Sequence, residues 1–190
     1  MGITTKTGDK GMTTDFRGRE VSKADLSIEL SGAFDEAESF LGYAIVEARQ
    51  GGGAIVASAR DRIPAGCSVT HIAPILQEQQ RALFACMAEL SGGESFDEDG
   101  RRLAALEDCV MKLSEQHSPT GFILPGGCEL AARLELARVA VRRCERRLIR
   151  ARGSMEVDPA ILAYLNRLSD FLFLAARLAN ASLGVEEAEV

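Results

Sequence analysis

The sequence predicts an all-α fold, a five-helix bundle behind an irregular N-terminal arm. Apolar residues recur at helical spacing in five stretches, strand-like alternation is scarce, and glycine-rich breaks separate the stretches. With 190 residues and 46% hydrophobic content, the chain can bury a core without disulfides. We expect one domain over residues 1–190, divided into an arm (1–25), a helical bundle (26–183) and a frayed tail (184–190).

The first three helices are expected at Asp25–Arg49, Ala73–Leu90 and Asp97–Gln116. In the first helix, one apolar stripe steps by four and three positions; its members are Leu30, Phe34, Ala37, Leu41 and Ala44. Two breaks rich in glycine follow the first and second helices, GGGAIVASARDRIPAG and SGGESFDEDG. The first break is interpreted as an irregular connection or mobile loop.

The last two helices have the clearest sequence signals. The fourth follows the segment SPTGFILPGG and carries apolar residues at bundle spacing from Leu130 to Leu148. The fifth begins after Asp158, with Pro159 in its first turn, which is the usual order of a capping residue and a proline. Both helices are therefore expected to bury one full face.

Composition excludes several classes of function. A net charge of -6 argues against general binding to nucleic acid or to an anionic membrane surface. No run of about 18 apolar residues occurs and the N-terminus lacks a signal-peptide layout, so a cytoplasmic protein is expected. The five cysteines are scattered without a CxxC pair, and His71 and His117 are far apart, which favours reduced thiols and no metal held by the protein alone.

Positive charge is concentrated in the fourth predicted helix, with eight arginines between Arg133 and Arg152. Arg138 and Arg142 are four residues apart and therefore share a helix face. Like charges at this spacing repel, so the pair indicates a carboxylate from another helix or a polyphosphate ligand. The alternative is a solvated face with intrahelical ion pairs.

The N-terminal segment TKTGDKGMTT (5–14) has the composition of a phosphate-binding loop. Gly8 and Gly11 permit turns that aim backbone amides at one point, and Lys6 and the threonine hydroxyls add donors. The segment does not match the Walker pattern, which needs a lysine and a hydroxyl directly after the last glycine. An ordinary turn is the alternative.

Two further segments carry candidate binding residues. FILPGG (122–127) places Phe122 just before a helix N-terminus, where unpaired amides favour anions; buried loop packing is the alternative. NRLSD (166–170) places Asn166, Arg167 and Asp170 on the polar side of an apolar helix, for which plain solvation is the alternative.

Taken in this order, these segments resemble the PduO-type ATP:cob(I)alamin adenosyltransferase family. The resemblance rests on TKTGDKGMTT, VSKADLSIELSGAFDEAESFLGYA, FILPGGCELAARLELARVAVRRCERRL and YLNRLSDFLFLAAR. It implies a homotrimer that binds ATP and a reduced corrinoid between neighbouring subunits. It also implies transfer of the 5′-deoxyadenosyl group of ATP to the cobalt of cob(I)alamin, which gives adenosylcobalamin and triphosphate.

The resemblance also implies a set of ATP-binding residues. Those that would wrap or reach the phosphates are Thr5, Lys6, Thr7, Gly8, Asp9, Gly11, Thr13 and Lys23. Arg138 and Arg142 would carry most of the electrostatic work, and Asp35 would pair with Arg138 across the subunit interface. Mg²⁺ would arrive with ATP and would not be held by the protein alone.

Three more residues are implied by the resemblance. Glu145 would lie near the nucleotide, Asn166 would contact ATP, and Phe122 would close the lower face of the corrin ring. The residues implied in catalysis are thus Arg138, Arg142, Asp35 and Phe122. A reductase and a cobalamin-dependent enzyme are further partners to expect.

The chain departs from the family pattern at Arg17, Ser31, Glu38 and Glu89. These departures leave open a non-catalytic carrier or sensor that binds ATP or adenosylcobalamin on the same fold. A third hypothesis is a structural helical oligomer whose arginine-rich helix meets an acidic partner.

Overall fold

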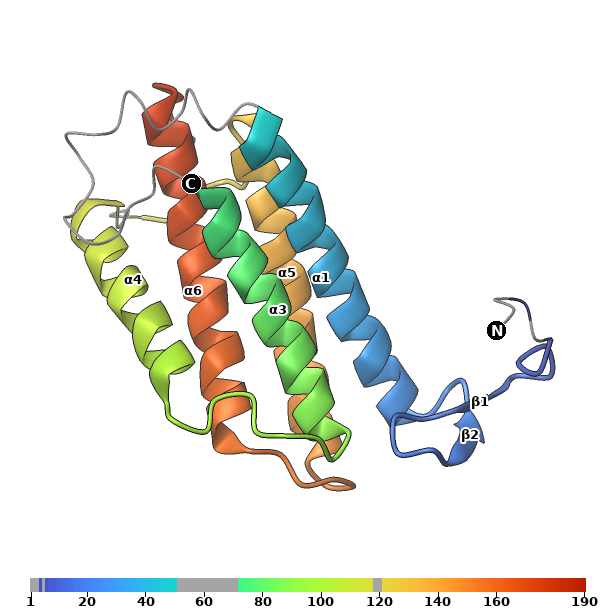
Figure 1. The fold of residues 1–190 in the computed structure, drawn as a ribbon. Coiled ribbons are helices and arrows are strands. Elements are labelled where there is room, and N and C mark those ends of the chain that lie inside the picture. The colour runs from blue at the N-terminus through green and yellow to red at the C-terminus, as the bar shows by residue number, and fades with distance from the viewer. Residues whose placement is uncertain (1–3, 5, 51–71, 118–120) are drawn as a thin grey trace.

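The computed structural model describes residues 4, 6–50, 72–117 and 121–190. Within them the helices are α1 (Leu26–Gln50), α3 (Ile72–Leu90), α4 (Arg101–His117), α5 (Glu129–Ala151) and α6 (Pro159–Ser182). The helices run side by side as one bundle (Figure 1), which confirms the all-α prediction. The loop predicted over GGGAIVASARDRIPAG lies outside the described residues.

The core forms where the predicted apolar stripes face one another. Helix α5 packs between α1 and α6, α3 packs on α1, and α4 packs on α6. All five members of the α1 stripe are fully buried, as are Leu134 and Leu148 of α5. None of the described helices is both long and apolar enough to cross a membrane.

The starts of α5 and α6 are fixed by side-chain caps. Asp158 accepts a hydrogen bond from the Ala160 amide at 2.8 Å ahead of Pro159, as the sequence predicts. At α5 the capping residue is Cys128, whose Sγ accepts from the Ala131 amide at 3.5 Å. Both caps satisfy amides that have no partner inside their helix.

The N-terminal arm contains a small hairpin that the sequence does not predict. Strand β1 (Met12–Thr14) pairs antiparallel with β2 (Glu20–Ser22). The buried Asp15 carboxylate closes the turn by accepting from the Arg17 amide at 2.9 Å and the Arg19 amide at 2.8 Å. The arm projects away from the bundle beyond the start of α1 (Figure 1).

The C-terminal tail differs from the frayed end that the sequence predicts. The Leu124 amide donates to the Ala188 carbonyl at 2.9 Å, and the Val190 amide donates to the Phe122 carbonyl at 3.0 Å. These bonds form an antiparallel bridge around Ile123. Main-chain groups of the tail thus find hydrogen-bond partners in the segment before α5, which is distant in sequence.

We predict that acid pH opens the turn of the arm. Burial raises the pKa of the Asp15 carboxyl, but hydrogen bonds and charge from Arg19, with a further hydrogen bond from Arg17, outweigh it and leave the pKa below its usual value. A carboxyl of this kind stabilises the folded turn at neutral pH, and its contribution is lost as pH falls through the lowered pKa.

NMR chemical shifts of the Arg17 and Arg19 amides, followed from neutral to acid pH, measure this opening. Asp15→Ala should remove the transition, whereas Glu20→Gln, an exposed change in the same hairpin, should leave it in place. Shifts that stay constant across the titration of the wild-type protein would contradict the prediction.

Candidate functional site

The arginines of α5 do not all face the same surroundings. Three of them pair with carboxylates of α1, namely Arg133 with Glu47 at 3.2 Å, Arg143 with Glu36 at 2.8 Å and Arg147 with Glu29 at 3.0 Å. Each pair is partly exposed and contributes about 0–1 kcal/mol at most. Their main effect is to fix how α5 lies against α1, and their charges are already matched by neighbouring acids.

The two arginines singled out by the sequence have fewer partners. Arg138 pairs with Glu135 on the preceding turn at 2.6 Å, and its side chain is 22% exposed. Arg142 is exposed and makes no ion pair within the described residues. Asp35 is exposed on α1 and does not pair with Arg138 inside one protomer. The pairing of Asp35 with Arg138 across an interface stays a prediction.

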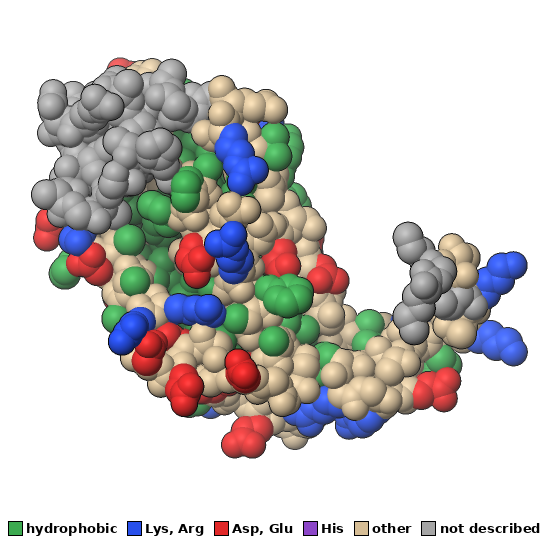
Figure 2. Space-filling view, in the orientation of Figure 1, with side chains coloured by type: hydrophobic (Ala, Val, Ile, Leu, Met, Phe, Trp, Pro, Cys, Tyr) green, Lys and Arg blue, Asp and Glu red, His purple; other side chains and the backbone are tan. Residues whose placement is uncertain are grey.

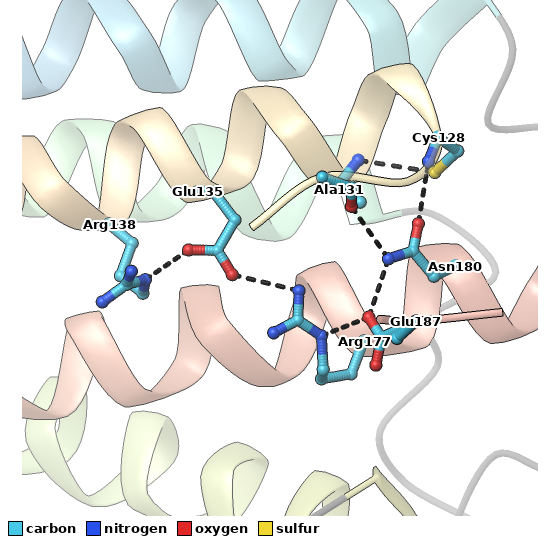
Figure 3. A network of polar contacts seen from close by, with 8 residues as sticks. Cys128, Ala131, Glu135, Arg138, Arg177, Asn180 and Glu187 are labelled. Carbon is cyan, nitrogen blue, oxygen red and sulfur yellow. Dashed lines mark hydrogen bonds and ion pairs between the residues drawn. The ribbon is translucent and has the colours of Figure 1, made fainter. Parts of the chain in front are cut away.

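Glu135 links Arg138 to a buried arginine of α6 (Figure 3). Its second oxygen lies 3.1 Å from Arg177, whose side chain is only 3% exposed. Arg177 also forms an ion pair with Glu187 in the tail, and its guanidinium lies 4.6 Å from the centre of the Phe173 ring. None of its nitrogens is aligned for a hydrogen bond within the described residues, so charge and the aromatic face hold it.

The loop before α5 is held by one asparagine of α6. Asn180 is 1% exposed; its Nδ2 donates to the Gly126 carbonyl at 3.0 Å and to Glu187 Oε1 at 2.7 Å. Its Oδ1 accepts from the Cys128 amide at 2.9 Å. Phe122, at the other end of this loop, is 84% exposed. The loop therefore exposes the ring of Phe122 to solvent while its other end is held by Asn180.

In the arm, Lys23 returns to the loop predicted to bind phosphate. Its amide donates to the Gly11 carbonyl at 2.9 Å, and a Cβ added at Gly8 would lie 3.0 Å from its Nζ. The side chains of Lys6 and Lys10 are exposed, and Figure 2 shows basic side chains at the projecting end of the arm. Thr7, Asp9 and Thr13 lie in the same segment, whereas Thr5 lies outside the described residues.

The arm and the arginines of α5 do not meet within one protomer. The arm projects from the start of α1 and does not fold back over the middle of α5 (Figure 1). A ligand that touches both would therefore need the arm of one copy of the chain and α5 of another.

The sequence matches the family model for cobalamin adenosyltransferase over residues 3–179. The chain belongs to the cobalamin adenosyltransferase family. The match includes the arm, the loop of Phe122 and α5, and it extends into α6 as far as the turn of Arg177.

Named relatives agree with the assignment of this adenosyltransferase. The chain is 34% identical to a corrinoid adenosyltransferase of Bacillus subtilis, across 100% of this chain and 92% of that protein. It is 31% identical to the corrinoid adenosyltransferase MMAB of Homo sapiens, across 97% of this chain and 71% of that protein. Against the corrinoid adenosyltransferase PduO of Salmonella typhimurium, identity is 33%, and the match spans 49% of that longer protein.

Solved structures share the fold of this adenosyltransferase. A variant PduO-type ATP:corrinoid adenosyltransferase from Lactobacillus reuteri, complexed with cobalamin and ATP, superposes with a TM-score of 0.79. Its sequence identity is 28%, and the match covers 100% of this chain and 96% of that one. Another variant from the same organism, complexed with ATP, gives a TM-score of 0.77 at 29% identity.

The remaining predicted residues of this adenosyltransferase lie on α5 and α6. Glu145 is half-buried on α5, and Asn166 is exposed on α6. Arg167 and Asp170, which lie beside Asn166 in the sequence, pair with each other at 2.8 Å. Of the polar group identified in NRLSD, Asn166 is therefore the member whose side chain is left for a ligand.

The sequence patterns did not predict the buried polar network of Arg177, Asn180 and Glu187, or the ion pair that joins Glu135 to it. A signal was present, because Arg177 and Asn180 lie three apart inside the apolar run LAARLAN, and so share one helix face. An arginine there needs a buried partner. Its partner Glu187 could not be assigned from pattern, because it lies in the segment predicted to be frayed.

We predict that Gly127→Ala destabilises the loop of Phe122. Gly127 has φ +101°, and a Cβ there would lie 2.2 Å from Asn180 Oδ1. The change should lower the free energy of unfolding by about 1–3 kcal/mol through backbone strain and should displace Asn180. Urea unfolding measures the loss.

Gly121→Ala is the matched control in the same loop, because among the described residues the nearest atom to a Cβ there would be Glu189 Oε2, at 3.9 Å. It should leave the free energy of unfolding nearly unchanged. Equal unfolding midpoints for the two variants would count against the described role of Gly127.

Proposed function

We propose that this chain transfers the 5′-deoxyadenosyl group of ATP to the cobalt of cob(I)alamin, giving adenosylcobalamin and triphosphate. The observation that carries this proposal is the family match over residues 3–179, which includes every candidate site residue from Thr5 to Asn166. Arg142, exposed on α5, suits an anionic substrate, and the exposed ring of Phe122 in the loop before α5 suits a flat, apolar one.

Arg138 and Arg142 stabilise the departing triphosphate. Negative charge grows on the phosphate chain as the bond to the 5′ carbon breaks, and fixed cations aimed at that charge lower the barrier. Arg142 is exposed, and Arg138 is oriented by Glu135 through its Nε, which leaves its terminal nitrogens for phosphate oxygens. Lys6 and a Mg²⁺ ion that arrives with ATP add to this field.

The arm of a neighbouring protomer completes the ATP site. Its members are Thr5, Lys6, Thr7, Gly8, Asp9, Gly11 and Thr13, which wrap the triphosphate, and Lys23, which reaches a phosphate. Asp35 of one subunit pairs with Arg138 of the next, and Glu145 and Asn166 contact the nucleotide. The projection of the arm away from its own bundle supports this homotrimer, since the arm is free to reach another copy.

Phe122 acts on the corrinoid. An aromatic ring against the lower face of the corrin excludes the lower axial ligand, and cobalt without that ligand is easier to reduce to the nucleophilic Co(I) state. Co(I) then attacks the 5′ carbon in line with the departing triphosphate, so no protein nucleophile is needed. The exposure of Phe122 on a fixed loop supports this role. A reductase supplies the electron and a cobalamin-dependent enzyme uses the product in the cytoplasm.

A carrier or sensor without turnover is the second candidate, and Glu38 favours it. This residue is partly buried on α1, and burial together with the nearby charge of Asp35 raises its pKa. An additional acid next to Asp35 weakens the positive field that a triphosphate needs. An absorbance assay with chemically reduced cobalamin, ATP and Mg²⁺ separates the two: conversion to the light-sensitive alkylated cofactor supports the enzyme, and tight binding without conversion supports the carrier.

We predict that Arg142→Ala lowers kcat about 100-fold or more in that assay, because one fixed cation facing the leaving group is lost. Helix content by circular dichroism should be unchanged, since Arg142 is exposed. Arg150→Ala removes an exposed arginine two turns further along α5 and serves as the control. Wild-type turnover by the Arg142 variant would contradict the assignment.

We predict that two inactive variants restore each other when their subunits are mixed. Lys6→Ala damages only the arm and Arg142→Ala damages only α5, so a mixed trimer contains some sites made from an intact arm and an intact α5. Equal mixing should recover about a quarter of the wild-type rate. Sedimentation of each variant alone should show a trimer. A mixture no more active than its components would place the arm and α5 of a single protomer at each site.

A further inference from the structure

The backbone of the Phe122 loop is held by the end of the chain. The Val190 amide bonds to the Phe122 carbonyl, and the Leu124 amide bonds to the Ala188 carbonyl, on either side of Ile123. Two such bonds at the surface contribute only about 1 kcal/mol each and do not by themselves order a tail. The tail must therefore be fastened elsewhere if it is to position Phe122.

Glu187 provides that fastening. It directly precedes the residues that pair with the loop, and it forms an ion pair with Arg177 and accepts a hydrogen bond from Asn180 Nδ2 at 2.7 Å. The Val185 amide adds a bond to the Asn180 carbonyl at 3.0 Å. The tail is thus attached to one turn of α6, and the neighbouring Glu186 is exposed and takes no part.

The same turn of α6 holds the other end of the loop. Asn180 bonds to the Gly126 carbonyl and the Cys128 amide, while Glu187 fixes the tail segment that pairs with the Phe122 end of the loop. The loop is consequently attached at both ends to α6, and Figure 3 shows these contacts converging on Arg177 and Asn180.

The turn of α6 that carries Arg177 is also connected, through Glu135, to Arg138, one of the residues proposed to bind the triphosphate. Arg177 lies between Glu187 and Glu135, and Glu135 orients Arg138 at 2.6 Å. Loss of Glu187 would leave Arg177 paired with Glu135, which still holds Arg138 through its other oxygen. Arg138 therefore keeps its partner, and the effect of the tail falls on the Phe122 loop.

We propose that Arg177 and Glu187 are positioning residues that set where Phe122 stands, by fastening the tail that pairs with its loop. This inference rests on the proposed function, in which Phe122 displaces the lower ligand of cobalt. Neither residue touches a substrate. Their effect is to keep the ring in place while the corrinoid is reduced, so loss of Glu187 acts on the corrinoid step more than on ATP binding.

The experiment compares Glu187→Ala with Glu186→Ala in the full-length protein. With ATP and cob(II)alamin bound, the electron paramagnetic resonance spectrum reports whether the lower nitrogen ligand remains on cobalt. Wild type and Glu186→Ala should show mostly cobalt without that ligand. Glu187→Ala should reduce that fraction and kcat about tenfold, because small displacements of a positioning group are costly. The Kd for ATP should stay within about twofold, since the arm and Arg142 are unchanged.

Deletion of Val190 is the second variant, in case Glu187→Ala lowers the yield of folded protein. The deletion removes the amide that bonds to the Phe122 carbonyl and leaves Arg177 and its carboxylates intact. We expect that a larger fraction of the cobalt keeps its lower ligand in this variant than in the wild type. An unchanged spectrum and kcat in both variants, beside an active wild type, would overturn this inference alone. A wild type that alkylates no cobalamin would overturn the proposed function and this inference with it.

Discussion

The buried charge of Arg177 is the constraint around which the Phe122 loop, the tail and the facing turn of α5 are arranged. A guanidinium removed from water needs opposite charge, and the bundle supplies it from two directions, with Glu135 from α5 and Glu187 from the tail. The consequence is that α5, the loop before it and the tail after α6 are all held by one turn of α6. Apolar residues could have filled this space with equal stability, but they would not have tied the tail to the loop.

The fold could be predicted because each helix has a sequence pattern that is local and repeats along the helix. Each helix buries a stripe that recurs every three or four residues, and the stripes of α1 and α5 are buried as expected. Asp158 and Pro159 likewise marked the start of α6. The hairpin of the arm could not be predicted from the sequence, because its strands are only three residues long. It also depends on Asp15, which caps the turn between them. The pairing of the tail with the Phe122 loop joins residues more than sixty positions apart in the chain, which no local pattern encodes.

The candidate site was predictable to a different extent for each residue. Arg138 and Arg142 are identified by their spacing within an arginine-rich helix, and Phe122 by its place in a loop of known resemblance. The partners of the other arginines could not be assigned in this way, because Arg133, Arg143 and Arg147 pair with a helix about a hundred residues distant. Glu135 shows the same difficulty: its first partner is one turn away, and its second is on α6.

The three ion pairs between α1 and α5 influence the direction in which Arg142 projects from α5. Successive residues of a helix are rotated by about 100°, so Arg133, Arg143 and Arg147 project within one sector of α5, and Arg138 and Arg142 project on roughly the opposite side. The three ion pairs between α5 and α1 cannot all form if α5 is rotated about its axis. The three pairs together therefore favour one rotation of α5 about its axis, and this rotation sets the direction in which Arg138 and Arg142 project.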